Sequence, residues 1–132
     1  MQLIETVVCD DQILAYILRA NITSAQTIFM TPHDLNVQLG FIVYPKGGEI
    51  SRHTHKAINR QIIGTFEVII VRRGRCEVDI YNDACEIVGT FELLAGDTIF
   101  MIGHGHGFRM LEDTILLEIK QGPYFSDEKQ RF

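Results

Sequence analysis

Short apolar, β-branched runs, separated by Gly, Pro, Asn or Asp about every ten residues, limit most strongly how this chain can fold. In the run CEVDIY, Glu77 and Asp79 alternate with Cys76, Val78 and Ile80. A period of two places the charged and the apolar side chains on opposite faces of a strand. The pattern therefore predicts antiparallel strands joined by tight turns.

We predict strands at 3–8, 13–20, 37–45, 66–74, 75–82, 86–93, 96–103, 107–114 and 115–122. Segment 13–20 could also be helical, but it lacks a clear cap and is predicted as a strand. Segments 32–36 and 55–65 are predicted loops, the second with room for one helical turn. Gly74 stands in a hairpin turn where a positive φ is useful. The expected fold is an all-β sandwich or barrel with no linker or internal repeat.

Composition excludes several classes of function. The net charge is −5, and the chain has no basic stripe or basic tail, which argues against nucleic acid and anionic membranes as partners. No apolar run approaches the roughly 20 residues that span a bilayer, and the N-terminus does not resemble a signal peptide. Three cysteines without a C-x-x-C spacing favour reduced thiols in a cytoplasmic protein.

The stretch HTH carries the first metal-ligating pattern, because His53 and His55 are two residues apart. On a strand, both side chains would project to the same face. Inside an apolar barrel, two neighbouring imidazoles favour a divalent cation between them. The alternative is a pair of surface histidines on an edge strand. Glu67 opens the most apolar predicted strand, where a carboxylate is out of place unless it is at the rim, paired or bound.

The order G-x-x-x-x-H-x-H, E-x-x-x-x-x-x-G, G-D and G-H-G-F resembles the two motifs of the cupin superfamily, in its small single-domain "cupin 2" type. Gly48 to Gly74 is similar to the first motif, and Gly96 to Phe108 to the second. The resemblance implies an antiparallel jelly-roll barrel (a double-stranded β-helix) forming a single domain over 1–132. Its core would span about 37–120, preceded by N-terminal strands at 3–20 and followed by a short charged tail at 122–132.

The resemblance also implies a divalent cation, Zn, Fe, Mn or Ni, bound by four side chains: His53, His55, Glu67 and His106. Eleven residues separate His55 from Glu67, where cupins usually have three or four. Either an inserted loop leaves Glu67 in register, or Gln61 or Asn59 replaces it as a ligand. The six-residue spacing from Glu67 to Gly74 favours the inserted loop.

Further candidates surround this set. His104, two residues before His106, is a rim residue, a substrate contact or a partner of the ligands. Arg60 and Arg109 are candidates to bind a substrate carboxylate or phosphate, with surface ion pairs as the alternative. Tyr44 and Phe108 are candidates to line the cavity, with core packing as the alternative.

Three functions follow as hypotheses. The first is a metal-dependent enzyme acting on a sugar-like molecule or small carboxylic acid, as an isomerase, an epimerase or an oxygenase. The second is a non-catalytic module that binds such a molecule in the barrel. The third is a metal-free sugar isomerase with histidines as acid and base. A homodimer is expected, with the apolar strand 3–8 as an edge contact.

Overall fold

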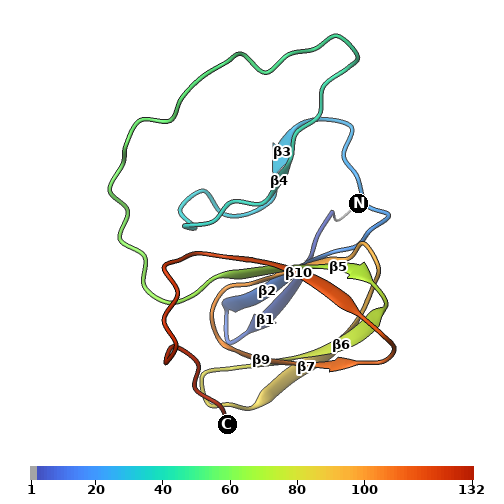
Figure 1. Cartoon of the computed structure of the whole chain (residues 1–132), viewed down its shortest axis with the longest axis vertical. Coiled ribbons are helices and arrows are strands. Elements are labelled where there is room, and N and C mark those ends of the chain that lie inside the picture. Colours follow the sequence, from blue (N-terminus) through green and yellow to red (C-terminus); the bar gives the residue numbers. More distant parts are fainter. Residues whose placement is uncertain (1–2) are drawn as a thin grey trace.

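The computed structural model describes residues 3–132, which form ten strands and no helix (Figure 1). The strands are β1 (Glu5–Cys9), β2 (Gln12–Leu18), β3 (Ile28–Phe29), β4 (Gly40–Phe41), β5 (Glu67–Arg73), β6 (Arg75–Tyr81), β7 (Ile87–Leu94), β8 (Thr98–Met101), β9 (Gly105–Met110) and β10 (Ile115–Lys120). Within this part of the chain, no helix is long and apolar enough to cross a membrane. The all-β prediction is confirmed.

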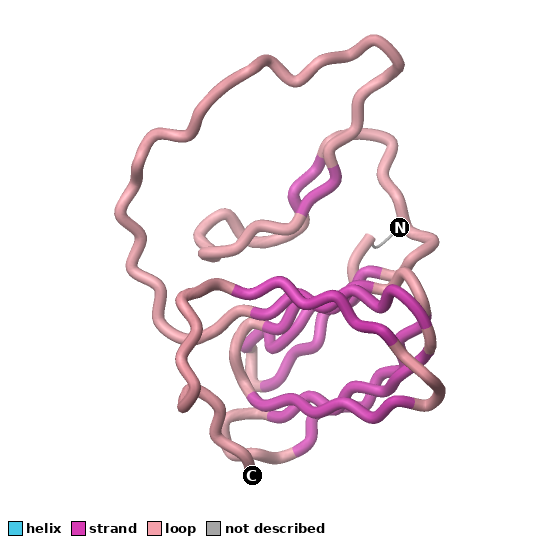
Figure 2. Tube along the Cα trace, viewed as in Figure 1, coloured by secondary structure: helices cyan, strands magenta, loops and turns pink. Residues whose placement is uncertain are grey.

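All strand pairs are antiparallel, in a large sheet ordered β1-β2-β8-β5-β10, a small sheet ordered β7-β6-β9 and the short β3-β4 hairpin. The large and small sheets face each other, as Figure 2 shows, and their inner faces enclose the main core. Val71 and Ile99 of one sheet and Val78 and Leu93 of the other are fully buried there. The arrangement is compatible with a jelly roll, although no sheet of the described residues closes on itself.

The outer face of the large sheet is partly covered by the segment that follows β3. Leu35, Val37 and Leu39 pack there against a second cluster, whose buried members are Tyr16, Phe66 and Phe100. The cover lies over β2 and β8, while Ile115, Leu117 and Ile119 on β10 remain exposed. The large sheet therefore has an apolar outer strip beside its β10 edge.

Residues 42–63, named here the arm, start at the end of β4, follow an extended path away from the two larger sheets and return to them at Phe66 (Figure 1). Every arm residue is exposed, and none belongs to a strand. The predicted strand at 37–45 is therefore wrong except for Gly40–Phe41, and no strand carries the HTH stretch. The predicted loop at 55–65 is confirmed, without a helical turn.

The other predicted strands are confirmed within a few residues at their ends. Register bears out the alternation predicted for β6, because Cys76, Val78 and Ile80 lie in the core. Gly74 joins β5 to β6 with φ of 91°. A side chain there would collide with the Asp113 carbonyl oxygen and Thr114, so both conformation and space require glycine.

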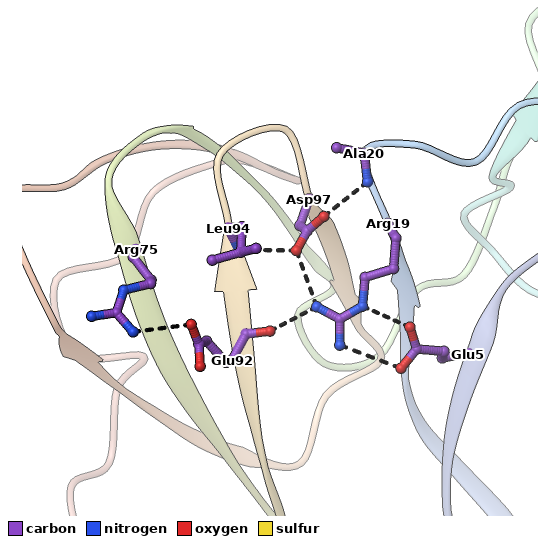
Figure 3. A network of polar contacts seen from close by, with 7 residues as sticks. All are labelled: Glu5, Arg19, Ala20, Arg75, Glu92, Leu94 and Asp97. Atoms are coloured by element: carbon purple, nitrogen blue, oxygen red, sulfur yellow. Dashed lines mark hydrogen bonds and ion pairs between the residues drawn. The ribbon is translucent and has the colours of Figure 1, made fainter.

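A buried carboxylate fastens the turn before β8 to the end of β2 (Figure 3). Asp97 is 4% exposed and accepts hydrogen bonds from the backbone N–H groups of Ala20 at 2.8 Å and Leu94 at 2.9 Å. Its third partner is the Arg19 guanidinium at 3.0 Å, which also bonds Glu5. The network joins β1, β2, β7 and β8 at one end of the molecule.

Candidate metal site

Glu67 and His106 approach each other from opposite sheets. Glu67 begins β5, on the inward-facing set that includes Ile69 and Val71. His106 lies on β9 opposite Ile80, a core residue of β6, and directly paired residues project to the same face. Strand register therefore turns both side chains into the space between the sheets.

The two side chains meet at hydrogen-bonding distance, with His106 Nε2 3.0 Å from Glu67 Oε2. Glu67 is only 8% exposed. The hydrogen bond from His106 lowers the pKa of the Glu67 carboxyl below its ordinary value and outweighs burial, which raises that pKa. Among the described residues, His106 Nδ1 is the one buried side-chain nitrogen or oxygen without a hydrogen-bond partner.

The C-terminal tail borders the same end of β9. Tyr81, His106, Gly107 and residues 129–132 line a cleft of about 450 Å³. Phe132 packs edge-on against Tyr81, with ring centroids 5.0 Å apart. Sequence reasoning treated 122–132 only as a surface extension and missed Lys129 and Arg131 as cleft residues. The signal was the sequence KQRF, two basic residues followed by an aromatic one.

The structure does not bring the HTH pair to Glu67 and His106. His53 and His55 lie on the exposed arm with ring centroids 5.1 Å apart, and His53 Nδ1 is 2.7 Å from the Ser51 carbonyl oxygen. No group of three or more His, Cys, Asp or Glu side chains in residues 3–132 is arranged to hold a metal ion. The four predicted ligands are thus split into one assembled pair and one distant pair.

The other candidates also divide between the sheets and the arm. Phe108 faces the core beside His106, with ring centroids 5.9 Å apart. His104 Nδ1 lies 2.7 Å from Asp83 in the turn after β6. The remaining four lie exposed on the arm: Tyr44, Asn59, Arg60 and Gln61.

Arg109 lies on the outer face of the small sheet because it pairs with Glu77, three register steps from His106. Its guanidinium donates to Asp79 at 2.7 Å and to Glu77 at 3.2 Å. Asp79 also accepts a hydrogen bond from the Thr90 hydroxyl at 2.6 Å. Arg109 thus joins β6 and β9 through ion pairs in this structure.

This network predicts a pH dependence of stability. The hydrogen bonds from Arg109 and then Thr90 hold the pKa of the Asp79 carboxyl below its ordinary 3.8. Stabilisation is therefore complete above the ordinary value and is lost as pH falls through the lower folded value. At about pH 6, the urea midpoint of Asp79→Asn should lie well below that of the wild type. The difference between the two midpoints should be smaller at about pH 3. A gap that widens in acid would contradict this assignment.

Comparisons with protein-family models, curated proteins and solved structures find no match for this chain. The cupin resemblance therefore stays a prediction.

Proposed function

We propose that this protein binds a divalent cation between Glu67 and His106 and uses it to bind or transform a small molecule. The observation that supports this proposal most directly is the distance of 3.0 Å between His106 Nε2 and Glu67 Oε2 in the space between the sheets. A carboxylate and an imidazole that converge in a largely buried position are suited to share a cation. The orphaned His106 Nδ1 shows that protein hydrogen bonds alone do not satisfy this imidazole.

Two protein ligands hold a cation weakly, so the proposal includes His53 and His55 as the remaining ligands. They reach the pair only if the arm lies against the edge of β9 that does not pair with β6. Imidazole and carboxylate together suit Zn, Fe, Mn or Ni. Four such ligands leave coordination positions open for a substrate on a metal that accepts five or six ligands.

The cleft beside His106 supports an anionic or polar small molecule as the ligand. Lys129 and Arg131 line it, and their positive charges suit a carboxylate. Tyr81 and Phe132 supply apolar walls. A bound cation would supply Lewis-acid polarisation of a carbonyl or carboxylate. Isomerisation or epimerisation of a sugar-like molecule fits this chemistry, as does oxygenation of a small acid if the metal is iron.

A second candidate function is acid–base catalysis without a metal. The hydrogen-bonded His106–Glu67 pair favours it, since a carboxylate can orient an imidazole that transfers protons. Turnover that survives a chelator would favour this candidate. Binding without any turnover on a panel of sugars and small acids would instead favour a non-catalytic module.

Elemental analysis of protein purified without added metal tests the proposal. We expect roughly one equivalent of a transition metal per chain, or uptake to that level when Zn²⁺, Fe²⁺, Mn²⁺ or Ni²⁺ is added to chelator-treated protein. Less than about a tenth of an equivalent with all four ions would overturn it.

A further inference from the structure

The arm exposes an unusual amount of apolar surface, although Val43 near its start is held by hydrogen bonds to the Thr27 hydroxyl. Ile58 is 62% exposed and Ile63 is 85% exposed. Five more large apolar side chains of the arm are exposed: Ile42, Val43, Tyr44, Ile50 and Ile62. Large apolar side chains gathered on one exposed segment indicate an interaction site. The arm therefore needs a covering surface.

The charge of the arm indicates which kind of surface would cover it. The arm carries Lys46, Arg52, Lys56 and Arg60 against a single acidic residue, Glu49, a formal charge of +3. The chain as a whole has a net charge of −5, so the remaining residues carry −8. The opposite net charges of the arm and the body favour association between two copies of the chain.

The body offers two open strand edges on one flank. β9 pairs with β6 and β10 pairs with β5, and the other edge of each strand faces no strand within residues 3–132. Residues 111–114 join the two strands, so the open edges are neighbours. Unpaired edges of this kind accept an added strand. The exposed strip Ile115, Leu117 and Ile119 lies on the outer face beside the β10 edge.

A turn in the arm separates its start, which stays with the β3-β4 hairpin, from the part that could be added to another edge. The N–H of Gly48 donates to the Pro45 carbonyl oxygen at 2.9 Å, and Gly47 adopts φ of 86°. Segment 49–55 follows this turn and is close to β9 in length, whereas Val43 before the turn is already hydrogen-bonded to the Thr27 hydroxyl. Alternation would then direct His53 and His55 inward, on the face that carries His106 on β9.

We infer that the arm docks on β9 and β10 of a second copy of this chain, so that two copies exchange arms and each supplies His53 and His55 to its partner's Glu67–His106 pair. The role given to the histidines rests on the proposed function, whereas the docking does not. A second copy is favoured because the arm projects away from its own sheets (Figure 1). Both of its ends are also held: Leu39 packs on the large sheet, and Gln121 bonds the Gly64 carbonyl oxygen and the Phe66 N–H. Exchange of an identical element is a direct route to a closed dimer.

A disulfide trap tests the docking without any metal. Thr54 alternates with the two histidines, and Gly107 alternates with His106, so the inferred pairing places both on the same outer face. A side chain at Gly107 meets nothing within 4 Å, so substitution there is tolerated. We expect Thr54→Cys/Gly107→Cys, in a Cys9→Ser/Cys85→Ser background, to oxidise to a covalent dimer. Thr54→Cys/Ile87→Cys is the matched control, because Ile87 lies on β7, at the opposite edge of the small sheet, and should not cross-link.

A monomeric mass by sedimentation at micromolar concentration would overturn the inference. So would an intrachain disulfide, or no disulfide, in the Thr54→Cys/Gly107→Cys variant. An intrachain bond would show that the arm folds onto its own β9.

Complementation then tests whether the ligands come from two chains. The two variants are His53→Ala/His55→Ala and Glu67→Gln/His106→Ala, and each alone should lose Zn²⁺ binding. After joint refolding in equal amounts, half of the dimers are mixed and each has one intact site, so about a quarter of the wild-type capacity should return. If the wild type binds Zn²⁺ but the mixture does not, ligand exchange is overturned and the metal proposal stands. If the wild type binds no Zn²⁺, the metal proposal fails, and the disulfide trap alone tests whether the arm docks on a second copy.

Discussion

His106→Ala is expected to weaken Zn²⁺ binding by a factor of about 100 or more, because it removes the ligand that converges with Glu67. The side chain is held between the sheets by β9, with its Nε2 3.0 Å from Glu67 Oε2. Isothermal titration of chelator-treated protein, or competition with a chromogenic chelator, measures the change. Thermal unfolding of the same variant separates a lost ligand from a lost fold.

His33→Ala is the matched control, since His33 is exposed in the loop after β3. Its Zn²⁺ affinity should stay within about threefold of the wild type. His104→Ala is informative because Asp83 bonds the His104 ring 2.7 Å away. Equal losses for His104→Ala and His106→Ala would contradict the assignment of His106 as the ligand of this pair.

Asp97→Ala is expected to cost about 3 kcal/mol of unfolding free energy, because it leaves buried hydrogen-bond donors without an acceptor. The backbone N–H groups of Ala20 and Leu94 both donate to this carboxylate, as does the Arg19 guanidinium (Figure 3). Urea unfolding followed by circular dichroism measures the loss as a lower midpoint with an unchanged slope.

The control for this variant is Asp34→Ala. Asp34 is exposed in the loop between β3 and β4, and its removal should change the unfolding free energy by less than about 0.5 kcal/mol. A loss below about 1 kcal/mol for Asp97→Ala would show that water satisfies the two N–H groups and that the network is not a structural anchor.

The strands from β5 to β10 could be predicted because their local signals agree. Apolar alternation, Gly74 and the Gly96–Asp97 pair each indicate strand or turn at the place where the structure has one. The strand at 37–45 could not be predicted correctly, because β-branched composition describes only a tendency to pair. Whether residues 42–45 form a strand depends on a neighbouring strand edge with which they could pair. The local sequence does not say whether such an edge is present.

The candidate site could be predicted in part. Glu67 and His106 are 39 positions apart in sequence, and the motif order alone placed them together. The structure brings them within hydrogen-bonding distance, which leaves their role as ligands a prediction. His53 and His55 were placed with them on the assumption of a strand that the structure does not contain.

Side-chain direction explains the different positions of Arg109 and Phe108. Both follow His106 closely, and both were candidates to contact a substrate. Strand register turns Phe108 toward the core and Arg109 toward Asp79 on the outer face. A shift of one residue reverses these directions, and pairing with β6 sets the register.

By itself, the sequence determined the all-β class, most strand positions and the turns, because these depend on local periodicity and on residues such as Gly74 that permit particular backbone angles. Only the tertiary structure decided which side chains meet. Strand order and register turned Glu67 and His106 toward each other, and the buried Asp97 network fastened one end of the fold. The arm was left exposed and outside every strand. Contacts between residues far apart in the chain depend on how the sheets pair and pack, and local sequence does not encode that geometry.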